Sequence, residues 1–146
     1  MKLVIGTDHR GFNIKQYLVS LKKIGLHEIS WLDIGTDNEE RVDYPLYAER
    51  AANSLLKNEV NGGVLLCGTG VGMSIATNRF DGIYAALVWN ENVASRAKKE
   101  DGANILVLPA DYLDNARAVS LIQSWLDADF LGGHYQDRLN QIDSFK

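Results

Sequence analysis

The sequence predicts an α/β protein: a three-layer α/β/α sandwich built on a five-stranded parallel sheet. The first observation is that short apolar segments alternate with amphipathic ones along all 146 residues, as in repeated strand–helix units. The second is that the apolar segments are nearly continuous, which is typical of strands covered by helices on both faces. The length, with 46% hydrophobic and 23% charged residues, fits one globular domain, which we expect to span residues 1–146.

Five segments have the apolar character of buried strands. Each is short and is followed by turn residues or by an amphipathic segment. In parallel sheets, ligands bind beyond the carboxyl ends of the strands, so the residues after the first and third strands are the candidates for a site. The predicted strands are residues 3–5, 28–32, 64–66, 85–88 and 105–108.

The helices are predicted between and after these strands. Gly25 is expected to cap the end of the first helix. Asp43 is expected to cap the second, with Pro45 in its first turn, and Asn90 to cap the fourth. The predicted helices are residues 12–23, 44–57, 71–78, 91–99, 112–127 and 135–144.

Composition excludes several classes of protein. A net charge of −4 and a pI near 5.3 argue against nucleic-acid binding, which needs a basic face. No apolar run approaches the roughly 18 residues of a membrane span. The amino-terminal residues run directly into a strand and a turn, so we expect no secretion signal. Cys67 is the single cysteine, which excludes an internal disulfide and favours the reducing cytoplasm.

A glycine-rich loop follows the third strand. Gly68, Gly70 and Gly72 alternate with Thr69 and Val71, and such a loop can direct backbone N–H groups at an anion, helped by the helix that follows. The loop fits a phosphate or a reaction oxyanion, and the alternative is a simple tight turn. Its spacing does not match the dinucleotide-binding or P-loop patterns.

Cys67 stands immediately before this loop. A thiol at the end of a strand and facing a helix N-terminus is expected to have a lowered pKa, which would make it a nucleophile or base. The alternative is a small buried hydrophobic residue. Thr69 is placed to donate its hydroxyl to the same ligand, or else to bond locally within the turn.

Polar residues also follow the first strand. Asp8, His9 and Arg10 leave the sheet at the same edge as Cys67, where an Asp–His pair can orient hydroxyls or move protons. The alternatives are a helix cap at Asp8 and solvated side chains at the other two positions. The three histidines lack metal-ligand spacing, so we expect neither a metal nor another cofactor.

These segments resemble the type B ribose-5-phosphate isomerase family, which is related to the galactose-6-phosphate isomerases. Residues 67–76 (Cys-Gly-Thr-Gly-Val-Gly-Met-Ser-Ile-Ala) match its central segment almost letter for letter. Residues 6–12 (Gly-Thr-Asp-His-Arg-Gly-Phe) and 42–45 (Val-Asp-Tyr-Pro) are also similar. Residues 103–106 and Gly132-Gly133 followed by Arg138 extend the resemblance over nearly the whole chain.

The resemblance implies a Rossmann-like fold and a metal-free aldose–ketose isomerisation of a sugar phosphate, with ribose 5-phosphate as the default substrate. It also implies a homodimer or tetramer whose active sites draw residues from both chains. It makes Cys67 the base that moves a proton between C2 and C1. Sugar and enediolate contacts are implied for Asp8, His9, Tyr44, Thr69 and the backbone of Gly68, Gly70, Val71 and Gly72.

The chain departs from the family where the sugar ring is opened and the phosphate is held. Glu100 and Asp101 occupy the positions of a histidine, which assists ring opening, and an asparagine. Asp111 and His134 occupy positions of phosphate-binding arginines, and only Arg138 remains.

Arg10 and His134 are candidates to replace the missing phosphate contacts, and the alternative for Arg10 is a solvated charge. Three functions stay open: an isomerase of ribose 5-phosphate, an isomerase of another aldose phosphate such as a hexose 6-phosphate or of an unphosphorylated sugar, and a non-catalytic sugar-phosphate-binding partner subunit.

Overall fold

Five parallel strands form the central sheet of the computed structural model, which describes residues 1–145. Their spatial order is β4-β1-β5-β7-β6, which confirms the predicted five-stranded parallel sheet. The strands are β1 (Lys2–Thr7), β4 (Ser30–Asp33), β5 (Gly62–Cys67), β6 (Ala85–Leu87) and β7 (Ile105–Pro109).

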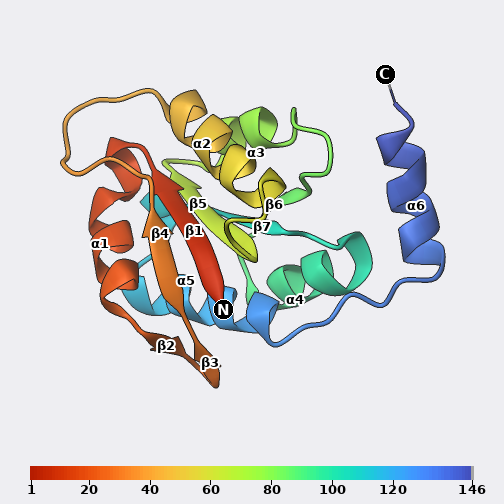
Figure 1. Cartoon of the computed structure of the whole chain (residues 1–146). Helices are drawn as coiled ribbons and strands as arrows, with labels where there is room; N and C mark the ends of the chain where they lie inside the picture. Colours follow the sequence, from red (N-terminus) through yellow and green to blue (C-terminus); the bar gives the residue numbers. More distant parts are fainter. Residues whose placement is uncertain (146) are drawn as a thin grey trace.

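Helices cover both faces of the sheet and give the three layers (Figure 1). On one face, α1, α4 and α5 enclose a core that includes Leu66 of β5; on the other, α2 and α3 enclose a core that includes Leu65 and Cys67. The α6 helix lies outside these layers, beside α4 (Figure 1). The helices are α1 (Phe12–Ser20), α2 (Tyr44–Leu56), α3 (Val71–Thr77), α4 (Glu91–Asp101), α5 (Asn115–Leu126) and α6 (His134–Asp143).

The start of the second predicted strand, 28–32, and the end of the first predicted helix, 12–23, are wrong, whereas residues 30–32 do lie in β4 as predicted. The helix stops at Ser20, and the chain makes a small antiparallel hairpin of β2 (Lys23–Ile24) and β3 (His27–Glu28) before β4 begins. Gly25 therefore caps no helix and instead turns this hairpin with a φ of 57°. Packing decides the outcome, because the hairpin buries Ile24 to 2% exposure against the main core.

The other helix ends lie close to the predicted positions, with local exceptions. The fifth helix begins at Asn115, later than predicted, because the Asp114 side chain accepts the Arg117 N–H and Tyr112 belongs to a separate 3₁₀ turn, η2 (Ala110–Tyr112). Asn90 caps α4 as predicted. Pro45 lies in the first turn of α2, whereas Asp43 makes no side-chain cap bond.

The strand order places a topological switch point between β1 and β5. The chain leaves β1 toward the neighbouring strand on one side, β4, and the rest of the sheet is built on the other side. Thr7 pairs with Leu66, and Cys67 pairs with Pro109. The residues that follow β1, β5 and β7 therefore leave the sheet side by side at one edge.

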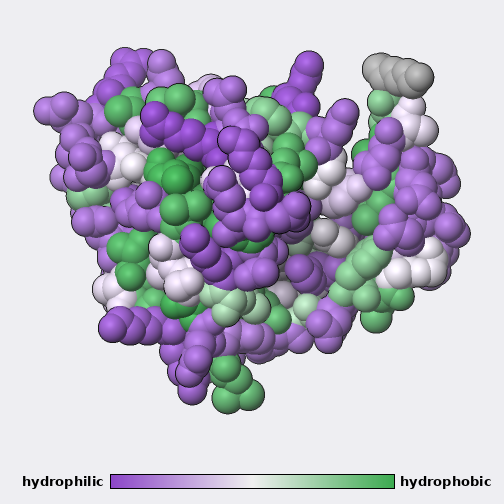
Figure 2. All heavy atoms as spheres, viewed as in Figure 1, coloured by the Kyte–Doolittle hydropathy of each residue, from purple (hydrophilic) through white to green (hydrophobic). Residues whose placement is uncertain are grey.

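The outer surface seen in Figure 2 carries mostly polar side chains with apolar ones scattered among them. Within residues 1–145, no helix has both the length and the apolar character that crossing a bilayer requires.

Candidate active site

Cys67 and Asp8 lie next to each other at the switch point. Asp8 follows β1, and Cys67 is the last residue of β5. Thr7 pairs with Leu66 in these adjacent strands, so the next residue of each strand lies beside the other. Cys67 is 4% exposed and Asp8 is 6% exposed. The carboxylate of Asp8 acts electrostatically on the thiol, so the structure brings together these two candidate residues.

Burial raises the pKa of the Cys67 thiol above its ordinary value. The backbone N–H groups of Met73, Gly70 and Thr69 point at the sulfur and partly oppose this shift, while the Asp8 carboxylate adds to it. The expectation of a lowered pKa for Cys67 is therefore wrong. The glycine-rich sequence indicated the N–H groups around the sulfur, but it did not indicate that the sulfur packs into the core beneath α2 and α3.

The glycine loop has the tight geometry that its sequence indicates. Gly70 has a left-handed backbone with φ 76°, and a Cβ atom there would collide with Leu87. The ring of Tyr44 lies directly on Gly72, where a Cβ atom would be 2.5 Å from the ring carbon Cζ. These glycines therefore allow β6 and α2 to approach the loop closely.

Thr69 makes the local turn bond that was its alternative role, because its Oγ1 accepts the Val71 N–H at 3.2 Å. The residue is exposed, and the hydroxyl hydrogen remains available for a ligand because the turn bond uses only the oxygen as acceptor.

Asp8 also caps the short 3₁₀ turn η1 (His9–Gly11), since its carboxylate accepts the Arg10 N–H at 2.9 Å. Burial is the largest influence on this group and raises the pKa of Asp8, against the lowering effects of that bond and of His9 and Arg10. His9 accepts the Val42 N–H at Nδ1 over 3.3 Å. This bond leaves the hydrogen of a neutral His9 ring on Nε2.

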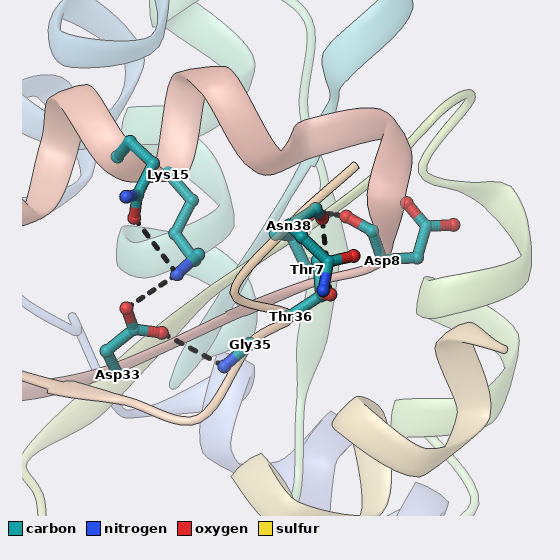
Figure 3. A network of polar contacts seen from close by, with 8 residues as sticks. Thr7, Asp8, Lys15, Asp33, Gly35, Thr36 and Asn38 are labelled. Carbon is teal, nitrogen blue, oxygen red and sulfur yellow. Dashed lines mark hydrogen bonds and ion pairs between the residues drawn. The ribbon is translucent and has the colours of Figure 1, made fainter. Parts of the chain in front are cut away.

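A polar network holds the segment that carries Val42. The buried Lys15 of α1 reaches Asp33 at the end of β4, with 2.6 Å between Nζ and Oδ2 (Figure 3). The same carboxylate accepts the Gly35 N–H at 3.0 Å, and the Thr36 N–H donates to the Thr7 carbonyl at 3.2 Å. The segment after β4 is thus fixed to β1 and α1 next to the site.

Arg10 and Asp111 form an ion pair that the sequence analysis did not foresee. Arg10 Nε donates to Asp111 Oδ1 at 2.9 Å, and Nη2 donates to Oδ2. From the sequence, Asp111 could be interpreted only as the replacement of an expected phosphate-binding arginine. The available signal was that Arg10 follows β1 and Asp111 follows β7, so opposite charges leave the sheet at one edge.

The remaining candidates form a second group on α4 and α6. Arg96 holds Glu100 through two hydrogen bonds of 2.9 and 3.0 Å, and this interaction is the main reason why the pKa of Glu100 lies below its ordinary value. Its position is therefore unsuited to a ring-opening acid, because the carboxylate is ionised at neutral pH. Arg138 and His134, both exposed, also act electrostatically on Glu100.

The candidate residues thus form two groups. The Cys67 group consists of Asp8, His9, Arg10, Tyr44, Cys67 and Thr69, and the Glu100 group consists of Glu100, Asp101, His134 and Arg138. Leu87 lies between the glycine loop of the first group and Glu100 of the second. A cavity of about 320 Å³ is lined by Leu87, Trp89, Arg96, Glu100 and Asp101, among others, and Leu87 also contacts the Gly70 turn. Among residues 1–145, no hydrogen bond or ion pair joins the Cys67 group to the Glu100 group.

A larger cavity of about 920 Å³ lies at the amino ends of β1 and β4 and is lined by Met1, Ser30 and Trp31, among others. We place the site at Cys67 nonetheless, because none of the candidate residues lines that cavity. In the described part of the chain, no three His, Cys, Asp or Glu side chains are grouped closely enough to hold a metal ion.

Comparison with known proteins identifies the family of the chain. Residues 3–142 match the family described as Ribose/Galactose Isomerase. The chain is 38% identical to ribose-5-P isomerase B of Listeria innocua, over 98% of this chain and 97% of that one.

Solved structures are also similar. A ribose 5-phosphate isomerase of Thermotoga maritima superimposes with a TM-score of 0.90 at 40% identity, covering 99% of this chain and 98% of that chain. A ribose-5-phosphate isomerase B of Mycoplasma genitalium, solved with bound ribulose-5-phosphate, gives a TM-score of 0.86 at 31% identity, covering 97% and 93%. The chain therefore belongs to the ribose/galactose isomerase family and is a sugar phosphate isomerase.

Proposed function

We propose that the protein interconverts ribose 5-phosphate and ribulose 5-phosphate through an enediolate, with Cys67 as the base. The observation that carries this proposal is the position of Cys67, beside Asp8 and beneath the N–H groups of Thr69, Gly70 and Met73. The names of the relatives from Listeria innocua and Thermotoga maritima support the same substrate.

In this reaction the sulfur of Cys67 takes the proton from C2 of the open-chain aldose, and the electron pair of that C–H bond forms the enediolate. The same proton returns to C1 while the hydroxyl proton on O2 moves to O1, which completes the ketose. The exposed Thr69 hydroxyl donates to the enediolate oxygen. One such donor lowers the barrier by on the order of 3 kcal/mol.

The other residues at this edge bind and orient the sugar in this proposal. Asp8 and His9 bind hydroxyls, with the Nε2 hydrogen of His9 directed to substrate because Nδ1 is occupied by Val42. Tyr44 lines the pocket against Gly72. The backbone of Gly68, Gly70, Val71 and Gly72 surrounds the reacting carbons.

We also propose a homodimer or tetramer in which a second chain completes each site. The support is that Glu100 and Asp101 line a cavity with Leu87, which also contacts the Gly70 turn, and that His134 and Arg138 act on Glu100 and not on Cys67 within one chain. In this arrangement, the partner's Arg138 and His134 face the sugar phosphate. A cytoplasmic location stays a prediction from the single free thiol.

An isomerase of another aldose phosphate, such as a hexose 6-phosphate, is the second candidate. The specific observation that favours it is the Arg10–Asp111 ion pair at the site, because Asp111 stands where the resemblance implies a phosphate-binding arginine, so the phosphate contacts of this chain differ from those implied for ribose 5-phosphate.

Steady-state rates of the purified protein on ribose 5-phosphate, hexose 6-phosphates and the free sugars decide between the candidates. We expect the highest kcat/KM on ribose 5-phosphate. A clear preference for a hexose 6-phosphate selects the second candidate, and no turnover of any aldose phosphate overturns both.

A further inference from the structure

The guanidinium of Arg10 is held at the active-site edge with one nitrogen left unused. Its side chain is 54% exposed, although Nε and Nη2 both donate to Asp111. Among residues 1–145, Nη1 has no hydrogen-bonding partner. The planar group therefore has one edge fixed by the protein and further donors that face solvent.

Both members of this ion pair are fixed through their backbones. The Arg10 N–H donates to the Asp8 carboxylate at 2.9 Å, and the Asp111 N–H donates to the Gly68 carbonyl at 3.0 Å. The two side chains lie over Gly68, where an added Cβ atom would be 2.9 Å from Asp111 Oδ2 and 3.5 Å from Arg10 Nε. The pair is thus built against the residue that follows Cys67.

This arrangement differs from an ordinary surface ion pair. Such pairs contribute little to stability, because solvent screens them and two long side chains lose conformational freedom. Here one carboxylate restricts a single guanidinium beside the thiol, and a restricted guanidinium with free donors suits the oxygen atoms of a phosphate. Arg10 and His9 are also the two groups of positive character that act on the buried Asp8.

We propose that Arg10, oriented by Asp111, binds the phosphate end of the substrate and so sets the preference for phosphorylated over free sugars. This inference rests on the proposed function in its choice of substrate class. In this arrangement the phosphate lies on the Cys67 side of the site. The arginine that binds it belongs to the same chain as the base.

Binding of ribitol 5-phosphate tests this proposal without any turnover, since it is an open-chain alcohol that cannot be isomerised. Calorimetry is carried out on the wild type, Arg10→Gln, Arg10→Lys and Arg79→Gln. The last variant removes the same charge from an exposed arginine in the turn that follows the carboxyl end of α3. Thermal unfolding of each variant confirms that it is folded.

We expect Arg10→Gln to weaken binding of ribitol 5-phosphate by about 10- to 100-fold, which is the effect of losing hydrogen bonds to a charged group. Arg10→Lys keeps the positive charge but lacks the planar guanidinium and its paired N–H donors, so this variant should retain part of the affinity. Arg79→Gln should bind within about twofold of the wild type, as expected for a distant site.

Equal affinities in Arg10→Gln and Arg79→Gln would overturn the proposal, and so would a wild type that does not bind ribitol 5-phosphate. The proposed function fails separately, if the wild type binds this ligand through Arg10 but converts no aldose phosphate. If ribose 5-phosphate is turned over equally well by Arg10→Gln and the wild type, the inference fails while the proposed function stands.

Discussion

The protonation of Cys67 is governed by burial more than by the N–H groups that surround it. Because the pKa of the thiol is raised, the thiolate is the minor form at neutral pH, and its fraction grows as the pH rises toward the folded-state pKa. A base must be deprotonated to act, so activity should follow the same curve. Sequence-based reasoning gave the opposite sign for this shift.

We therefore predict that kcat/KM for ribose 5-phosphate increases by about tenfold per pH unit through the neutral range and levels off only above the ordinary thiol pKa. The pH–rate profile is compared with the ultraviolet thiolate absorbance of the free protein, for which Cys67→Ala is the blank because the chain has one cysteine. A profile that is flat across neutral pH would contradict the raised pKa.

Asp8 provides a second test of the same electrostatics. Asp8→Asn removes the negative charge that raises the Cys67 pKa, yet keeps a side-chain oxygen that can accept the Arg10 N–H. We predict a lower thiol pKa in this variant, measured by the same absorbance titration in the absence of substrate.

The matched control is Asp81→Asn, which removes a carboxylate at an exposed position beyond α3. It should leave the thiolate titration unchanged. If Asp8→Asn titrates like this control or at higher pH, the carboxylate does not act on the sulfur as described.

At the residue scale, the sequence could place functional groups but not their partners. Cys67, Asp8 and Thr69 were predicted at one edge, because strand ends and glycine spacing are local patterns. The bonds from Val42 to His9 and from Arg10 to Asp111 join residues that are distant in the sequence. Such pairs depend on strand order, which periodicity does not supply.

The start of the segment between β4 and α2 is held by a single buried charge, Lys15 of α1. Lys15 is 2% exposed, and its ammonium group is paired with Asp33, which is partly exposed (Figure 3). Removing one partner of a buried pair is costly because the other charge loses its compensation. Here solvent reaches Asp33 and reduces that cost.

We predict that Lys15→Met, which keeps the apolar stem but loses the ion pair, lowers the free energy of unfolding by about 1–3 kcal/mol. Urea unfolding at a fixed protein concentration measures the change. Lys22→Met, at an exposed position, should change it by less than about 0.5 kcal/mol. Equal stability of the two variants would show that the Lys15–Asp33 pair does not support the fold.

The positions at which helices and strands begin and end show where tertiary packing overrides the local sequence pattern. The central strands β1, β5 and β7 were predictable because both of their faces are buried and their residues are almost continuously apolar. The hairpin after α1 was not predictable in this way. Ile24 and Ile29 fit a helix or strand pattern equally, and only their burial against the core selects the hairpin.

At the scale of the whole molecule, the candidate residues divide into the Cys67 group and the Glu100 group. The α6 helix, which carries His134 and Arg138, lies beside α4 and outside the three layers (Figure 1). The spatial relation between the groups could not be predicted from the residue pattern, and only the resemblance implied that two chains share each site. Subunit mixing tests that implication directly.

If the sites are shared, Cys67→Ala and Arg138→Ala chains should each be inactive alone and should complement each other when they are refolded together. Random pairing in a dimer makes half of the molecules mixed, each with one intact site, so about a quarter of wild-type activity should return. Separately refolded and then mixed samples serve as the control. Activity no greater than the sum of the two variants, or a monomer in solution, would contradict shared sites.

The most direct test of the account is the turnover of ribose 5-phosphate by Cys67→Ala, measured alongside its binding of ribitol 5-phosphate. Removing a proton-transferring base should lower kcat by at least about 100-fold, while affinity for the unreactive phosphate and the unfolding temperature stay close to the wild type. A kcat within a few-fold of the wild type would contradict the central claim that Cys67 moves the proton.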